Sequence, residues 1–197
     1  MELVANIISL FKKDNKLEAK HGEKVMQKRL GTEQKALAFY DKQVLDYLNN
    51  DMMAFIKKQE NAFISTSDAN GHCDSSYRGG EAGFIKIIDK KNVIYPEYIG
   101  NGVQASLGNM YENPHVAILL IDFYKHQIGL HLNGRVEILG KDEVDIEDGE
   151  QKKIKCWVKV EIEEAYIHCS KRIPHLEKVR ENNENKAFGN FFKTLGK

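Results

Sequence analysis

The strongest constraint on this chain is a series of strand-like segments in its second half. Residues 129–140 and 155–169 alternate apolar and polar side chains, and residues 116–123 form a nearly continuous apolar run. Alternation with a period of two places one face of a strand against a core, and a short apolar run is typical of a fully buried strand. The second half of the chain is therefore expected to build a β-sheet.

Two further strand pairs are expected earlier in the chain. Residues 62–67 and 72–77 flank the sequence Asp-Ala-Asn-Gly, a tight-turn signal that predicts a β-hairpin. Residues 84–88 and 93–95 flank a second polar turn. Pro96 follows, and because proline cannot donate a backbone hydrogen bond, we expect it to end the last of these strands.

Helical signals precede and interrupt the strands. From residue 33 to residue 59, apolar side chains recur at helical spacing, which predicts helix packed on the core. A shorter helix is expected over residues 103–112, before Asn113-Pro114 stops it. Several strands at short spacing with one inserted helix favour a closed or nearly closed antiparallel barrel.

The charge balance and the N-terminus narrow the partners. Lysine plus arginine number 29, as do aspartate plus glutamate, so no basic excess points to nucleic acid. The apolar stretch at residues 1–11 lacks the features of a signal peptide and is too short to span a bilayer. Three widely spaced cysteines favour a reducing compartment. We expect a cytoplasmic protein with neither a nucleic-acid nor a membrane partner.

The histidines suggest no metal site. Neighbouring residues on a strand point to opposite faces, so adjacent pairs rarely supply two ligands to one ion. This applies to His72-Cys73 and His168-Cys169. Four more histidines show no constellation and are expected to be strand or surface residues: His115, His126, His131 and His175.

Two glycine-bearing segments carry the candidate chemistry. Residues 74–86 place three glycines within five positions beside Arg78. Glycine lets a backbone approach a ligand closely, and arginine offers a planar fork for phosphate. Residues 100–109 lead from glycines into a helix start, where free amides and the helix dipole favour an anion. The alternative is an ordinary turn and an ordinary capped helix, with Arg78 a solvated charge.

The order and spacing of these and later motifs resemble the pyridoxamine 5′-phosphate oxidase-related FMN-binding proteins. The matching runs are Ser76-Tyr77-Arg78-Gly79-Gly80, Gly83-Phe84-Ile85-Lys86, Gly100-Asn101-Gly102, Ser106-Leu107-Gly108-Asn109, Asn113-Pro114, Leu120-Ile121-Asp122-Phe123 and Asn133-Gly134-Arg135-Val136. Earlier, His21-Gly22-Glu23 with Gln27 resembles the signature of one branch of the family, although Glu23 is better explained by the start of a helix.

The resemblance implies a fold and an assembly. The fold is mainly β, of the α+β class: a split antiparallel β-barrel of the FMN-binding type, with N-terminal helices and a short inserted helix. Residues 1–31 would form an N-terminal helical extension, residues 32–176 the FMN-binding split-barrel domain, and residues 177–197 a C-terminal helix or tail. The family forms homodimers with two flavin mononucleotide (FMN) sites at the subunit interface.

The resemblance also implies which residues hold the cofactor. Lys86 would face the flavin and its ribityl phosphate, and Arg78, with Gly79, would approach from the preceding loop. Gln104 and Ser106 would hold the phosphate.

Further residues would complete the same site. Asn101 and Asn109 would shape the phosphate loop. The strand end at His168 and Lys171, reaching across from the other subunit of the dimer, would meet the flavin ring, and Cys169 with Lys171 resembles the last-strand motif of the family.

The implied activity is that of an FMN-dependent oxidoreductase acting on a small-molecule substrate, with room for a separate electron-donor protein. The oxidase itself has an arginine-lysine pair where this chain has Ala105 and Ser106, so the resemblance supports FMN binding more than vitamin B6 oxidation. The alternatives are a non-catalytic protein that stores or senses FMN or another flat anionic cofactor, such as haem or a deazaflavin, and a purely structural barrel.

Overall fold

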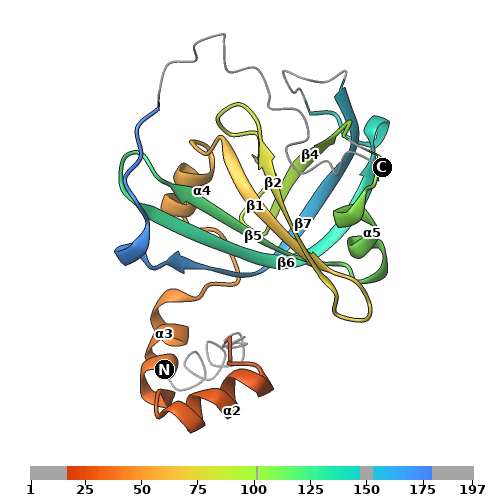
Figure 1. The fold of residues 1–197 in the computed structure, drawn as a ribbon. Coiled ribbons are helices and arrows are strands. Elements are labelled where there is room, and N and C mark those ends of the chain that lie inside the picture. The colour runs from red at the N-terminus through yellow and green to blue at the C-terminus, as the bar shows by residue number, and fades with distance from the viewer. Residues whose placement is uncertain (1–16, 101, 147–152, 179–197) are drawn as a thin grey trace, which may run out of the picture.

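A computed structural model describes residues 17–100, 102–146 and 153–178. They form one seven-stranded sheet in the order β2-β1-β5-β6-β7-β4-β3 (Figure 1). The strands are β1 (Asn61–Ser67), β2 (Cys73–Gly79), β3 (Lys86–Ile87), β4 (Asn92–Tyr98), β5 (His115–Asp122), β6 (Ile128–Gly140) and β7 (Ile154–His168). The helices are α2 (His21–Leu30), α3 (Glu33–Gln43), α4 (Asn50–Ile56) and α5 (Ala105–Glu112), with 3-10 turns at Lys141–Glu143 and Ser170–Arg172.

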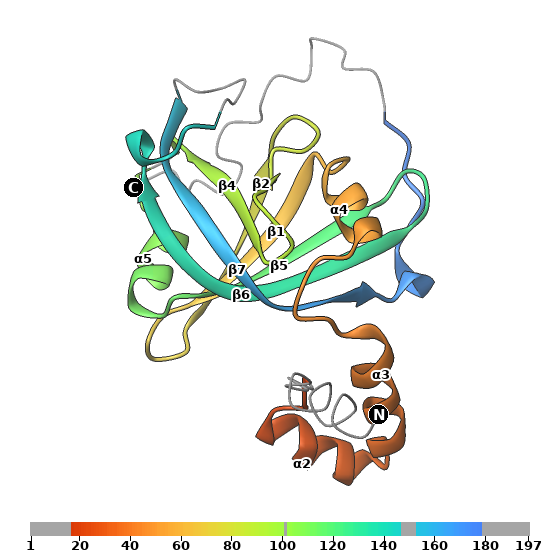
Figure 2. The ribbon, with the colours of Figure 1, turned by 180° about the vertical axis from the view of Figure 1, so that it is seen from behind.

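All pairings between these strands are antiparallel, and the sheet curls without closing. Its outermost strands, β2 and β3, are not neighbours in the strand order, so the barrel stays split between them. Figures 1 and 2 show the curl, with α4 and α5 at the margins and α2 and α3 set away from the sheet. The α+β class and the split-barrel architecture are confirmed.

The core lies on the concave face, where alternate residues of each strand point. β1 and β5 have nearly strict alternation between buried and half-buried or exposed positions, as the sequence pattern predicts. The fully buried members include Ala62, Ile64, Ile118, Leu120, Leu132, Val158, Val160 and Ala165. A second, smaller cluster forms around Trp157 with Ile94 and Ile154.

A β-bulge interrupts the long β6–β7 ladder. Asn133 is opposite Glu164 and Gly134 is opposite Ile162, so Glu163 is an extra residue without a partner on β6. A Cβ on Gly134 would lie 2.1 Å from the backbone oxygen of Glu161, so the close approach of the two backbones requires glycine here.

The helix expected from residue 33 to residue 59 is wrong as a continuous element. It is two helices, α3 and α4, separated by an extended segment in which Leu45 pairs with Ala165 of β7. The Leu45 N–H donates to the Ala165 carbonyl at 3.0 Å, and the Ala165 N–H donates back at 2.7 Å. Asn49 then caps α4, its Oδ1 accepting the Met52 N–H at 2.9 Å. No residue of α3 is buried, so its apolar spacing does not mark core packing.

The expected end of a strand at Pro96 is also wrong, because β4 continues to Tyr98. β3 pairs with β4 only at Val93 and Ile94, so at Pro96 one side of β4 is a sheet edge. An edge tolerates the missing N–H of proline. The strand expected over residues 84–88 shrinks to Lys86–Ile87.

The short inserted helix is confirmed as α5, and the hairpin of β1 and β2 is confirmed as well. The helix-start role of Glu23 is confirmed: its carboxylate accepts the Lys20 N–H at 2.6 Å, just before α2 begins. Residues 1–16 of the expected N-terminal extension and most of the expected C-terminal tail lie outside the described residues. Within the described ranges, no helix combines the length and apolar character needed to cross a bilayer.

Candidate functional site

A cleft of about 460 Å³ lies where the end of β2, the end of β4 and the start of α5 meet. Its volume falls within the range of small-molecule sites. β2 is on one side of the split in the barrel, and the part of β4 beyond its pairing with β3 is on the other. The two glycine-bearing segments that the sequence singles out therefore meet at this cleft, together with the end of β4.

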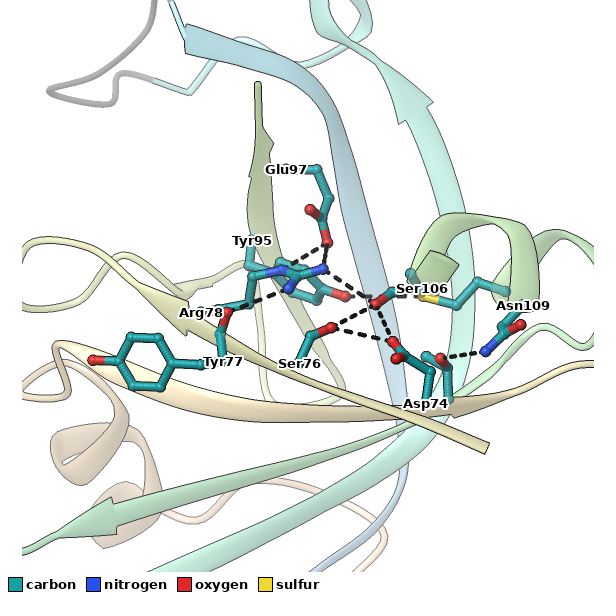
Figure 3. Close-up of polar contacts among 10 residues, drawn as sticks. Asp74, Ser76, Tyr77, Arg78, Tyr95, Glu97, Ser106 and Asn109 are labelled. Carbon is teal, nitrogen blue, oxygen red and sulfur yellow. Dashed lines mark hydrogen bonds and ion pairs between the residues drawn. The ribbon is translucent and has the colours of Figure 1, made fainter. Parts of the chain in front are cut away.

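An ion pair crosses the cleft from β2 to β4 (Figure 3). The Arg78 guanidinium donates to Glu97 Oε1 from Nε at 3.0 Å and from Nη2 at 2.9 Å. Its Nη1 donates to the Tyr77 carbonyl at 3.3 Å. The side chains of Arg78 and Glu97 are only 20% and 8% exposed. A pair this buried is poorly screened by solvent, so each charge depends on the other.

Ser106 joins this ion pair to a second carboxylate. Its hydroxyl lies 3.3 Å from Arg78 Nη2, from which it accepts, and 3.0 Å from Asp74 Oδ2, to which it donates. The Ser76 hydroxyl also donates to Asp74 Oδ2, at 3.1 Å, and lies 3.2 Å from Ser106 Oγ. Figure 3 shows the chain of contacts that results, from Glu97 through Arg78 and Ser106 to Asp74.

The backbone at the start of α5 places Ser106 in this chain. The residue before the helix, Gln104, has a left-handed backbone with φ of 58°, which is uncommon for a residue other than glycine or asparagine. Such strain persists only where the surrounding structure enforces it, and it is often found at functional sites. Asn109, one turn along α5, donates from Nδ2 to Thr66 Oγ1 at 3.0 Å and so anchors the helix to β1.

The remaining walls of the cleft are largely apolar. Tyr98, Ile99, Val103 and Leu107 contribute to them, and Ile99 and Val103 are 60% and 72% exposed. Gly79, Gly100 and Gly102 leave the backbone open to a ligand. An apolar wall beside a few convergent polar groups is typical of a site for a flat organic ligand.

Two groups close to the Arg78–Glu97 pair are held in their protonated forms. Burial, followed by the charge of Glu97, raises the pKa of the Tyr95 phenol far above its usual range. Burial and then Glu97 also raise the pKa of the Cys156 thiol, which is opposite Glu97 on β7. Both groups therefore stay protonated at neutral pH, and neither is an activated base or nucleophile.

The structure brings together four of the residues that the sequence proposes for the cofactor: Arg78, Gly79, Gln104 and Ser106. Asn109 lies next to them and holds α5, in agreement with a shaping role. Asn101 lies outside the described residues.

The other proposed residues lie elsewhere in the protomer. Lys86 is half-buried on β3, opposite Ile94, and is not among the described residues that line the cleft. His168 ends β7 and Lys171 lies in the following 3-10 turn, both outside the cleft lining of their own protomer.

Sequence reasoning missed Glu97 and Asp74. Glu97 did offer a signal, because it is the lone charge in the otherwise apolar run from residue 93 to residue 99, and a charge in such a strand must find a partner. Asp74 offered no comparable signal. It shares one face of β2 with Ser76 and Arg78, and a polar face is ordinary for a strand of a hairpin.

The expectation that His131 belongs to no constellation is wrong. On the convex face of the sheet, His131 Nε2 lies 2.8 Å from His168 Nδ1. The His131 ring also stacks on Tyr166, with centroids 4.7 Å apart and an interplanar angle of 17°. Burial, and then the charge of His168, lowers the pKa of His131 below its ordinary value. Tyr166 in turn meets Phe39 of α3 edge to face.

Comparison with solved structures gives distant likenesses. HupZ of Group A Streptococcus is 20% identical, covering 61% of this chain and 93% of its own, with a TM-score of 0.48. A Clostridium acetobutylicum protein related to general stress protein 26 is 13% identical, covering 61% and 90%, with a TM-score of 0.45. HutZ, the heme storage protein of Vibrio cholerae, is 15% identical, covering 61% and 93%, with a TM-score of 0.42. Likenesses this distant carry no functional argument.

The family model is more informative. No curated protein sequence matches the chain. The model described as pyridoxamine 5′-phosphate oxidase, however, matches residues 48–169. This range contains every strand of the sheet and the whole cleft of Arg78, Glu97 and Ser106. The chain therefore belongs to the pyridoxamine 5′-phosphate oxidase family.

Proposed function

We propose that this protein binds a flavin, FMN, and acts as a flavin-dependent oxidoreductase on a small molecule. The observation that carries the proposal is the cleft between β2, β4 and α5, which sets an arginine and two serine hydroxyls beside an apolar wall. A flavin combines a flat apolar ring with a polar chain, so it calls for both kinds of surface. Membership of the family agrees with this choice.

The residues present fit most of such a ligand. Tyr98 and Leu107 offer apolar surface for the ring, and the hydroxyls of Ser76 and Ser106 offer hydrogen bonds for the ribityl chain. Arg78 is the only lysine or arginine among the described lining residues, so the phosphate would depend on it. Lys86 of this protomer and, in a dimer, the partner's His168 and Lys171 would complete the cofactor contacts.

A bound flavin would supply the redox chemistry by accepting and returning electrons. The protein's own residues would bind it, orient it and exclude water. The raised pKa values of the neighbouring Tyr95 phenol and Cys156 thiol, which keep both groups protonated, suit this division of labour. A small-molecule substrate would enter on the open side of the cleft, and a separate electron-donor protein is a further partner to seek.

We also propose a homodimer, supported by a row of side chains across the convex face of the sheet. Tyr77, Phe63, Leu119, His131 and Tyr166 lie directly opposite one another on five consecutive strands. Phe39 covers only the Tyr166 end of this convex row, and Tyr77 at the other end is 63% exposed. A largely apolar row on an open sheet is suited to burial against a second copy.

We also propose that the chain consists of an N-terminal extension at residues 1–31, a cofactor-binding barrel at residues 32–176 and a C-terminal segment at residues 177–197. The free thiols of Cys73, Cys156 and Cys169 support a cytoplasmic location.

The test is the visible absorption spectrum of the purified full-length protein, before and after adding FMN and desalting. Retained flavin bands that bleach with a reduced nicotinamide and recover in air would support a flavin oxidoreductase. Retained bands that resist reduction by any donor would favour the storage or sensing alternative. A protein that retains no flavin would overturn the proposal.

A further inference from the structure

The polar end of the cleft has an unusual feature for a site that must hold a phosphate. Its hydrogen-bond donors are already directed at carboxylates of the same chain. Arg78 gives two hydrogen bonds to Glu97, and the hydroxyls of Ser76 and Ser106 both donate to Asp74. The cleft lining thus contains one guanidinium and two carboxylates.

Glu97 occupies the recognition surface of the arginine. The edge of a guanidinium that carries Nε and Nη2 is one of the two that can grip an oxyanion, and both of these nitrogens point at Glu97 Oε1. Because Glu97 is almost fully buried, its charge is felt at close range with little screening. A phosphate that approached Arg78 on this edge would meet a carboxylate first.

We propose that Glu97 is a specificity residue that competes with the phosphate of the ligand for Arg78, and so weakens the preference of the cleft for FMN over riboflavin. This inference rests on the proposed flavin binding. Riboflavin has the same ring and ribityl chain without the phosphate, so the carboxylate penalises only one of the two ligands.

Asp74 provides a matched comparison within the same cleft. It carries the same charge as Glu97, but its carboxylate accepts hydrogen bonds from the hydroxyls of Ser76 and Ser106, whereas that of Glu97 accepts from Arg78. Replacing either carboxylate by its amide removes one negative charge and hardly changes the volume. A difference between the two variants therefore reports the direct competition at Arg78 and not the general charge of the cleft.

The experiment measures the dissociation constants of FMN and of riboflavin for the full-length wild type, Glu97→Gln and Asp74→Asn, by quenching of flavin fluorescence. In Glu97→Gln we expect FMN to bind about ten- to hundredfold more tightly, the effect of one freed charge-assisted contact, with riboflavin unchanged within about threefold. In Asp74→Asn the ratio of the two constants should change by less than about threefold, because the Arg78 pair is intact.

The outcomes separate the inference from the function on which it rests. If Glu97→Gln changes both ligands alike, or neither, while the wild type binds flavin, then Glu97 is not a competitor and flavin binding stands. If Asp74→Asn shifts the ratio as much as Glu97→Gln does, general charge is the cause and the inference fails. If the wild type binds neither flavin, the proposed function fails too.

A second variant guards against loss of folding in Glu97→Gln, which thermal melting would reveal. Glu97→Asp keeps the charge and shortens the side chain, so the carboxylate draws back from Arg78. We expect FMN affinity to rise in this variant by a smaller factor, with riboflavin again unchanged. An unchanged ratio in a folded Glu97→Asp protein would also count against the inference.

Discussion

His131 Nε2 and His168 Nδ1 lie 2.8 Å apart on the convex face of the sheet. The hydrogen bond between these two imidazole rings links β6 to β7. A hydrogen bond between two imidazoles needs one ring to accept, so at least one of them must be neutral. The lowered pKa of His131, caused first by burial and then by the charge of His168, identifies His131 as the ring that resists a proton.

This pair predicts a loss of stability in mild acid. In the unfolded chain His131 takes up a proton near its ordinary pKa of 6.5, whereas in the folded protein it does so only at lower pH. Below pH 6.5 the unfolded state therefore binds more protons, and stability falls as the pH falls. Melting temperatures measured from pH 7.5 to pH 5 should drop, and His131→Gln should flatten that drop.

His72 is the matched control for this prediction, because its linkage has the opposite sign. Its hydrogen bond and ion pair with Asp68 raise its pKa, so its contribution is present at low pH and is lost as the pH rises. His72→Gln should therefore leave the acid-side drop as steep or make it steeper. A His131→Gln profile that stays parallel to the wild type would contradict the assignment.

Breaking the Arg78–Glu97 pair should destabilise the protein, whatever it binds. Arg78→Ala leaves a nearly buried carboxylate without a partner, which costs about 3 kcal/mol in comparable pairs. The double variant Arg78→Ala with Glu97→Gln should recover a large part of that loss, because the stranded charge is gone. Urea unfolding of the wild type, the single variants and the double variant checks this, and simple additivity of the single effects would refute the coupling.

Two glycines should respond in opposite directions to alanine. At Gly134 the new Cβ would lie 2.1 Å from the Glu161 carbonyl oxygen, so Gly134→Ala should cost about 1–3 kcal/mol or more through forced separation of β6 and β7. At Gly108, in the middle of α5, nothing lies within 4 Å, so Gly108→Ala should gain about 0.5–1 kcal/mol from helix propensity. Thermal and urea unfolding measure both, and a neutral Gly134→Ala would argue against the bulge.

The convex row predicts where a charge would break the dimer. Leu119→Glu places a carboxylate at the middle of the row, between Phe63 and His131, and should shift the protein to monomer in light scattering after size exclusion. Ile138→Glu adds the same charge at a 38% exposed site on β6 outside the row, and should leave the dimer intact. A wild-type monomer, or equal effects of the two variants, would contradict this interface.

The strands could be predicted from sequence because alternation is a local property. The limits expected for the segments at residues 62–67, 116–123, 129–140 and 155–169 agree with β1, β5, β6 and β7 to within a residue. The break between α3 and α4 could not be predicted, because it depends on Leu45 meeting Ala165, a residue 120 positions later. Helical spacing continues through the break, and only the tertiary pairing interrupts it.

Only the part of the cleft that comes from local sequence segments could be predicted. Arg78, Gly79, Gln104 and Ser106 are within two short segments whose composition marks them. Glu97 joins them only because β4 lies across the split from β2, and His131 meets His168 only because β6 pairs with β7 in one particular register. Such neighbours follow from strand order, which a single sequence does not reveal.

The extra residue at Glu163 sets the phase of the last strand. Just before it, the even-numbered Val158, Val160 and Ile162 of β7 face the main core; after it, the buried residue is the odd-numbered Ala165. That change of parity turns Tyr166 and His168 outward. If Glu163 were instead paired in a regular ladder without the bulge, Tyr166 and His168 would point into the core and Ala165 would point outward. The bulge therefore decides which face of the sheet carries the aromatic and imidazole groups.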